Sequence, residues 1–316
     1  MLVFGIVVGV FIALNALILI VFHAIYRKMF AHRADRTVPG VRDRAVEEFE
    51  GLKAEPFSFV SDGVMLRGFR YTGAEDNGKR IVFAHGIGAG HEAYLTEIAY
   101  FCGRGYEVCA FDFPGCVRSD GNKIGGMHVS VPHFLNGLNY IRETFGEKPL
   151  YLVGHSWGGY TVTAAAKASG ARAVVEISGF VRPAKVYAAL LGKWMYPWIK
   201  IYLFLRFGKK GDLAAKESDV PVLALHGTAD KIVPLSVSIA KAGFANVKAC
   251  FCEGKRHNPY STKEADAYLC KLFASAPKKG ANREEAERFF GSIDYIKATE
   301  EDAAVMEKIV SFLESV

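Results

Sequence analysis

The longest uninterrupted apolar run lies at the start of the chain. Residues 2–22 carry no charge, and Asn15 is their one amide. A helix of this length extends about 30 Å, which matches the hydrocarbon core of a bilayer. The pattern therefore predicts a transmembrane anchor over residues 1–26. A cleaved signal peptide is the alternative, but it needs a basic segment before the apolar run and a small-residue cleavage site after it.

Polar and basic positions follow the apolar run. Arg27, Lys28, Arg33 and Arg36 form a basic cluster, and Pro39-Gly40 breaks any regular structure. Because basic residues flank membrane helices on the cytoplasmic side, the remainder of the chain is expected in the cytoplasm. Residues 27–55 are predicted to be a juxtamembrane linker.

From residue 56 onward, short apolar runs alternate with longer helical patterns. This alternation predicts an α/β fold with a mostly parallel, doubly wound sheet covered on both faces, formed by residues 56–316. Thr299 and Asp302 are expected to form a capping box for the last helix. The expected strands are 57–60, 65–71, 80–84, 106–111, 150–153, 173–177, 220–225 and 247–252, and the expected helices are 91–104, 132–145, 159–169, 236–242 and a closing helix that ends near 313.

Composition and charge add two points to this pattern. The chain is 51% hydrophobic with a net charge of +6, and residues 177–211 contain seven basic residues and no acidic one. That local excess favours a membrane-facing or anion-facing surface over nucleic-acid binding. The six cysteines form no C-x-x-C pair or zinc-finger spacing, so buried reduced thiols are expected.

A Gly-x-Ser-x-Gly motif follows the apolar run that ends at Val153. Gly154, Ser156 and Gly158 make up this motif, and a helical pattern begins directly after it. A strand that turns sharply into a helix at this motif is a nucleophile elbow, which exposes a serine hydroxyl. Ser156 is therefore the predicted nucleophile.

Two further polar residues lie in loops that follow consecutive predicted strands. Asp230 comes first and His257 second, so the chain order is serine, acid, histidine. Parallel strands bring such loops to one edge of the sheet, which predicts a Ser156–Asp230–His257 triad. A serine hydroxyl needs a base, and histidine needs a carboxylate that fixes its tautomer. Glu176, near a strand end, and Asp266, in a helical run, are the rival acids.

An acyl-transfer site also needs hydrogen-bond donors for the oxyanion. The backbone N–H of Trp157 follows the nucleophile, and the backbone N–H of Ile87 lies in the glycine-rich loop 85–90. These two groups are the predicted oxyanion hole. His85, in the same loop, is expected to be a structural hydrogen-bonding residue.

These motifs together resemble the α/β-hydrolase superfamily. The H-G-x-G of residues 85–88, the D-x-P-G of residues 112–115 and the elbow occur in the family's order. The pattern looks most like bacterial esterases and the related serine aminopeptidase-like and monoacylglycerol-lipase-like branch. The resemblance implies a helical cap over about residues 180–219, inserted before the acid-bearing strand. It also implies an acyl-enzyme on Ser156 that water resolves.

The cap segment is rich in aromatic and basic residues. Trp194, Trp198 and Tyr202 are the predicted substrate-binding residues of this segment. Apolar bulk can wall an acyl pocket, and aromatic residues with Lys and Arg can enter an anionic membrane surface. An ordinary cap packed on the core and a lipid-facing cap are both open at this point.

The sequence thus predicts a membrane-anchored serine hydrolase, with a carboxylesterase acting on lipophilic or medium-chain acyl esters as the leading hypothesis. A peptidase, an amidase, a thioesterase and an acyltransferase of the same fold are alternatives. A non-catalytic, membrane-tethered binding protein is a further alternative from another class. The expected partners are a small-molecule or lipid ester and the membrane, without nucleic acid. No motif indicates a metal or nucleotide cofactor.

Overall fold

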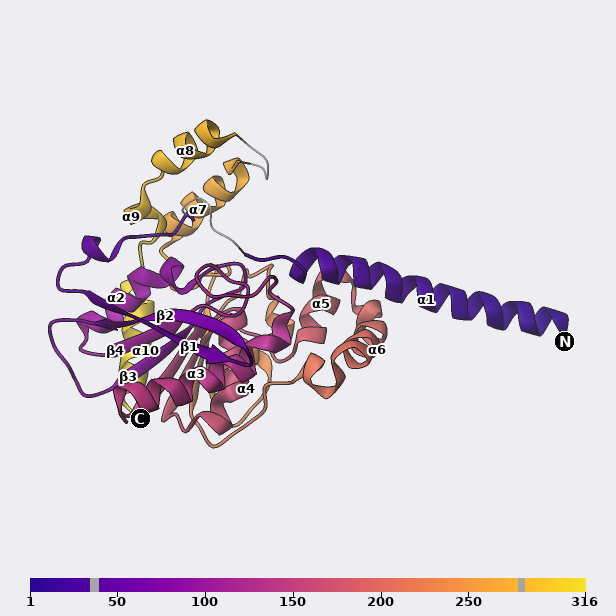
Figure 1. Cartoon of the computed structure of the whole chain (residues 1–316), viewed down its shortest axis with the longest axis horizontal. Coiled ribbons are helices and arrows are strands. Elements are labelled where there is room, and N and C mark those ends of the chain that lie inside the picture. Colours follow the sequence, from indigo (N-terminus) through magenta and orange to yellow (C-terminus); the bar gives the residue numbers. More distant parts are fainter. Residues whose placement is uncertain (35–39, 278–281) are drawn as a thin grey trace.

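The computed structural model describes residues 1–34, 40–277 and 282–316, so Arg36 and Pro39 of the predicted linker lie outside the described residues (Figure 1). A single eight-stranded sheet has the order β1-β2-β4-β3-β5-β6-β7-β8. The strands are β1 Lys53–Ser61, β2 Val64–Thr72, β3 Arg80–Ala84, β4 Glu107–Phe111, β5 Leu150–His155, β6 Ala173–Ile177, β7 Val222–Gly227 and β8 Val247–Cys252.

The sheet is mostly parallel, which confirms the predicted fold class. Strands β1 and β2 form an antiparallel hairpin, and β2 pairs antiparallel with β4. All pairs from β4 to β8 are parallel. The carboxyl ends of these six strands therefore meet at one edge, where ligand sites form in such sheets.

Helices cover both faces of the sheet. α3 Ser130–Phe145 and α4 Trp157–Ser169 pack on one face, whereas α2 Leu95–Gly103 and α10 Ala303–Glu314 pack on the other. Successive side chains along a strand point to opposite faces. Val82 and Leu152 pack in the hydrophobic cluster under α3 and α4, and Phe83 and Val153 pack in the cluster under α2 and α10. Because both faces are covered, the central strands consist of mostly apolar, buried residues and do not alternate between apolar and polar residues.

The C-terminal part differs from the single closing helix that was predicted. Between β8 and α10, the residues that the structure describes form three helices: α7 Lys263–Ser275, α8 Arg283–Gly291 and α9 Tyr295–Ala298. The predicted capping box is wrong, because Asp302 is itself the N-cap of α10 and accepts from the Ala304 and Val305 amides. The predicted helix over 236–242 consists of two short 3₁₀ turns, Leu235–Val237 and Ile239–Lys241, and Ser238 caps the second one.

The N-terminal helix α1 Leu2–Phe30 continues four residues beyond the predicted anchor. Its first part projects away from the body of the molecule (Figure 1). Phe22, Tyr26 and Phe30 are buried in the same hydrophobic cluster as the α3–α4 face of the sheet. The end of α1 is thus part of the core, and residues 27–30 are helix rather than linker.

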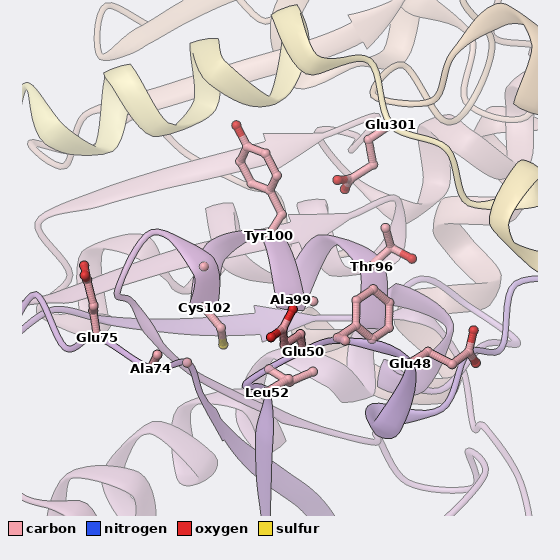
Figure 2. Close-up of a pocket in the computed structure, with 13 residues that line it drawn as sticks. Glu48, Glu50, Leu52, Ala74, Glu75, Thr96, Ala99, Tyr100, Cys102 and Glu301 are labelled. Carbon is pink, nitrogen blue, oxygen red and sulfur yellow. The ribbon is translucent and has the colours of Figure 1, made fainter.

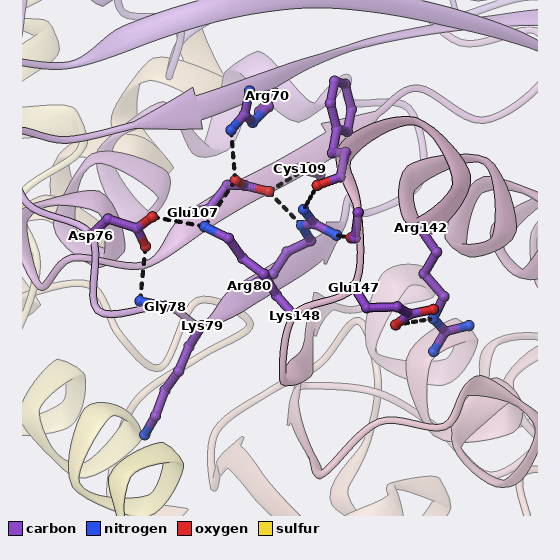
Figure 3. A network of polar contacts seen from close by, with 12 residues as sticks. Arg70, Asp76, Gly78, Lys79, Arg80, Glu107, Cys109, Arg142, Glu147 and Lys148 are labelled. Atoms are coloured by element: carbon purple, nitrogen blue, oxygen red, sulfur yellow. Dashed lines mark hydrogen bonds and ion pairs between the residues drawn. The ribbon is translucent and has the colours of Figure 1, made fainter.

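A buried ionic network lies at the opposite, amino edge of the sheet (Figure 3). Glu107 at the start of β4 accepts from Arg80 at the start of β3, and it also pairs with Arg70 at 2.9 Å and Lys148 at 3.3 Å. Burial raises the pKa of the Glu107 carboxyl, but its arginine partners outweigh burial and lower that pKa. This network fixes the starts of two central strands at the end far from the predicted triad.

Candidate active site

Ser156 lies at the turn between β5 and α4 in a strained backbone conformation. Its φ of 57° and ψ of −113° are unusual for a residue with a side chain. A Cβ on Gly154 would lie 2.4 Å from the Gly158 carbonyl oxygen, and a Cβ on Gly158 would lie 1.9 Å from that of Ala84. Both glycines of the motif are therefore required by close backbone contacts, and the elbow forms as the motif predicts.

The structure brings Asp230 and His257 together. The Nδ1 of His257 lies 2.7 Å from Oδ2 of Asp230. The other carboxylate oxygen accepts from the amides of Ile232 and Val233 at 2.8 and 3.0 Å. Burial raises the pKa of Asp230, but the His257 contact and the two amides outweigh burial and lower that pKa. An ionised Asp230 can hold the His257 Nδ1–H, which leaves Nε2 as the base.

His155, the residue before the nucleophile, joins the histidine loop to the elbow. Its Nε2–H donates to the carbonyl oxygen of His257 at 2.9 Å, and the two imidazole rings lie 4.8 Å apart. Its Nδ1 accepts from the Tyr94 hydroxyl at 2.9 Å. Burial lowers the pKa of His155, which keeps the ring neutral with one donor and one acceptor. The prediction missed His155, because the motif alone leaves its position unspecified.

The two rival acids have other partners. The Glu176 carboxylate accepts from the Gly179 amide at 2.7 Å, and burial raises the pKa of Glu176 to about 8. A carboxyl that keeps its proton at neutral pH is a poor partner for an imidazolium. Asp266 forms an ion pair with Arg256 at 3.0 Å. Among the three candidate acids, Asp230 alone has a hydrogen bond to His257 in the described residues.

The predicted oxyanion loop is held by buried polar groups. The Ala89 amide donates to the Gly86 carbonyl, and Gly88 has a φ of 73°, as in a type II turn with Ile87 at its second position. Under the loop, His85 accepts from the Phe113 amide at 2.9 Å through Nε2, in agreement with a structural role. The other predicted donor, Trp157, begins α4, where the first backbone N–H groups have no partner within the helix.

The cap consists of α5 Pro183–Leu191 and α6 Tyr196–Phe207 between β6 and β7. The Trp198 indole donates to the Asn15 side chain at 2.7 Å, and the Tyr202 hydroxyl lies 2.8 Å from Nδ1 of His23. Trp194 is 61% exposed. The structure therefore places Trp198 and Tyr202 at the contact with α1. Their predicted role in substrate binding, like that of Trp194, stays a prediction.

A cavity of about 650 Å³ lies away from the triad, between residues 48–52, the end of β2, α2 and the start of α10 (Figure 2). Its lining includes the carboxylates of Glu48, Glu50, Glu75 and Glu301. Cys102 also lines it, and burial raises the pKa of this thiol to about 12, so the thiol is unreactive at neutral pH. In the described parts of the chain, no group of three or more His, Cys, Asp or Glu side chains is placed to hold a metal ion.

Comparisons with known proteins agree with this geometry. The family model of the alpha/beta hydrolase fold matches residues 79–198. An esterase from Pyrococcus furiosus superposes with a TM-score of 0.54 at 17% identity, covering 75% of this chain and 94% of the esterase. The chain therefore has the α/β-hydrolase fold.

Two further proteins are similar to the chain. The Pyrococcus horikoshii acylaminoacyl peptidase superposes with a TM-score of 0.54 at 18% identity, covering 84% of this chain and 45% of the peptidase. The uncharacterized protein YfhR of Salmonella typhimurium is 26% identical over 68% of this chain and 79% of its own length. The family model and the shared fold support hydrolase activity for this chain.

Proposed function

We propose that the protein is a membrane-anchored serine hydrolase with Ser156 as nucleophile, His257 as general base and Asp230 as the acid that orients His257. The observation that carries this proposal is the 2.7 Å hydrogen bond between Asp230 and His257, in a loop that His155 ties to the strained elbow. His257 takes the proton of the Ser156 hydroxyl as that oxygen attacks the acyl carbon. The Ile87 and Trp157 amides stabilise the oxyanion.

Collapse of the tetrahedral intermediate releases the alcohol, which takes its proton from His257. Water then attacks the acyl-enzyme in the same manner and restores Ser156. Each half of this cycle moves one proton to His257 and one proton away from it. The ionised Asp230 stabilises the imidazolium that forms in both halves, without being protonated itself.

The proposed substrates are carboxylic esters of lipophilic or medium-chain acyl groups. The cap between β6 and β7 presents large apolar side chains, and Phe204 and Leu205 among them are exposed. A peptidase or amidase is the second candidate, because the acylaminoacyl peptidase shares the fold. The cap segment 177–211 is basic, so it is poorly suited to bind the ammonium group of an aminopeptidase substrate.

We further propose that α1 is a retained anchor that places the catalytic domain on the cytoplasmic side. This helix is long and apolar enough to cross a membrane. A signal sequence passes the same test. Cleavage after α1, however, would remove Phe22, Tyr26 and Phe30 from the hydrophobic core. Arg27 and Lys28 in its last turn favour a cytoplasmic position for the end of α1.

The test is a panel of p-nitrophenyl esters from acetate to palmitate, with aminoacyl p-nitroanilides beside it. The full-length protein is compared with Ser156→Ala and His257→Ala. We expect turnover of the esters, highest at medium or long chains, and at least about 10³-fold less turnover in both variants. Turnover that survives in Ser156→Ala would refute the mechanism. No turnover by wild type would favour a non-catalytic binding protein, and preference for the anilides would favour the peptidase.

A further inference from the structure

A second cavity, of about 340 Å³, lies where α1 meets the cap and the loop that precedes α3. Its size lies within the range of about 300–1,000 Å³ that is typical of small-molecule sites. Three separate parts of the chain form it, and none of them contributes to the triad. We call it the junction cavity, and its lining residues are His23, Tyr26, Arg27, Phe30, Ala31, Lys123, Gly125, Tyr202, Arg206 and Phe207.

Three cations from three segments surround the junction cavity: Arg27 on α1, Lys123 on the loop and Arg206 on α6. All three residues are exposed. Within residues 1–34, 40–277 and 282–316, no carboxylate forms an ion pair with any of them. Among the residues that the structure describes, no carboxylate pairs with these three charges at the mouth of the cavity, which favours an anion there.

The walls of the junction cavity are already organised. The Tyr26 hydroxyl donates to the carbonyl oxygen of Gly125 at 2.9 Å, which ties α1 to the loop. The Tyr202 hydroxyl contacts His23 at 2.8 Å, which ties α1 to α6. The rings of Tyr26 and Phe207 lie 5.5 Å apart and add an apolar floor. A ligand would therefore enter a preformed site at little cost in ordering the chain.

The junction cavity lies where the apolar part of α1 ends. Residues 2–22 carry no charge, and His23, the next residue, lines the cavity. If residues 2–22 span the hydrocarbon core, the cavity lies at the level of the lipid headgroups. On α6, Ile201 and Leu205 precede the cavity residues Tyr202 and Arg206 by one position each and are exposed. An apolar surface for acyl chains thus lies beside the charged mouth.

We propose that the junction cavity binds the phosphate of an anionic phospholipid. Arg206 and Arg27 supply planar guanidinium donors for the phosphate oxygens, and Lys123 adds a third charge. The acyl chains of the lipid lie along α1 and the exposed apolar residues of α6. This inference rests on the proposed membrane anchoring of α1 and is independent of the proposed ester chemistry.

The experiment is a lipid titration of the full-length, detergent-solubilised protein followed by native mass spectrometry. The probes are palmitoyl-oleoyl phosphatidylglycerol and the phosphatidylcholine with the same chains. The test variant is Lys123→Ala/Arg206→Ala, and the matched control is Lys209→Ala/Lys210→Ala, which removes the same charge from the cap outside the junction cavity. Intact folding of each variant is checked by its thermal unfolding curve.

Wild type and control are expected to prefer phosphatidylglycerol over phosphatidylcholine. The test variant is expected to bind phosphatidylglycerol roughly 30-fold more weakly, because each basic contact to an anionic lipid contributes about fivefold. Equal affinity for both lipids in wild type, or equal losses in both variants, would overturn the proposal. Complete competition by inorganic phosphate would assign the cavity to a free anion instead. If wild type binds phosphatidylglycerol but does not hydrolyse esters, the proposed ester hydrolysis is refuted and the lipid-binding proposal stands.

Discussion

Phe22 provides a direct test of whether α1 is part of the folded domain or only a tether. Its side chain is 1% exposed, and its ring centroid lies 4.9 Å from that of Tyr202 and 5.9 Å from that of Tyr187, both on the cap. The change Phe22→Ala removes both contacts and leaves a cavity between α1 and the cap. A helix that merely tethers the domain would tolerate this change.

The expected loss can be worked out from these contacts. Each aromatic pair contributes about 0.5–1.5 kcal/mol beyond its buried area, so two pairs contribute about 1–3 kcal/mol. In detergent the α1 helix stays in an apolar environment when it leaves the cap. The transfer free energy of the ring is therefore nearly the same in both states, and the cavity adds a smaller cost. We expect a loss of about 2–3 kcal/mol, which for a chain of 316 residues lowers the Tm by roughly 3–5 °C.

The assay is thermal unfolding of the full-length protein in detergent, followed by near-UV circular dichroism. The matched control is Phe11→Ala, because Phe11 is 66% exposed on the same helix and the chemical change is identical. We expect the control to unfold within about 1 °C of wild type, as surface changes do. Equal Tm values for the two variants would refute the conclusion that the end of α1 belongs to the core.

Three further predictions follow from the site and the cap. Asp230→Asn, which presents an amide to His257, is expected to lower kcat about 10³–10⁴-fold with little change in KM, as measured by steady-state ester hydrolysis. The pKa of Glu176 is about 8 in the folded protein and about 4.3 in the unfolded chain. Its contribution therefore lowers the free energy of unfolding as pH rises from about 4.3 to about 8. Glu176→Gln should therefore raise the Tm more at pH 8 than at pH 5, and an equal gain at both pH values would contradict this. Trp194 is exposed, and its ring lies 5.9 Å from that of Trp198, which contacts Asn15 of α1. Its fluorescence should be quenched by brominated phosphatidylcholine in reconstituted vesicles, and a Trp194→Phe variant that is quenched as strongly as wild type would argue against a membrane contact.

Much of the fold could be predicted because its signals are local. The strands of the parallel sheet are continuous apolar runs, and the elbow requires glycine at positions 154 and 158 for steric reasons that any sequence must meet. The order of Ser156, Asp230 and His257 then placed the candidate residues at one edge. These predictions needed no knowledge of how distant segments pack.

The parts that could not be predicted depend on long-range contacts. The role of His155 arises from a hydrogen bond to residue 257, and nothing near position 155 indicates that partner. The sequence predicted Trp198 and Tyr202 as substrate-binding residues, but aromatic side chains can lie either on the surface of the cap that faces the active site or on the surface that packs against another helix. Only the packing of α1 against α6 shows that Asn15 and His23 are their partners.

The C-terminal end of α1 also depends on long-range contacts. Charge at Arg27 and Lys28 marks the end of the apolar run, but the helix continues to Phe30 because the aromatic side chains there are buried under the cap. Tyr26 and Phe30 both contact Tyr187, at centroid distances of 6.2 and 6.0 Å. Tertiary packing therefore extends the helix beyond the limit that polarity alone suggests.

Covalent labelling of Ser156 tests the central claim most directly. The full-length protein is incubated with a fluorophosphonate probe, and the modified peptide is located by mass spectrometry, with Ser156→Ala and His257→Ala in parallel. We expect one adduct on Ser156 in wild type, no adduct in Ser156→Ala and strongly slowed labelling in His257→Ala. Equal labelling of wild type and Ser156→Ala, or an adduct at another residue, would contradict it.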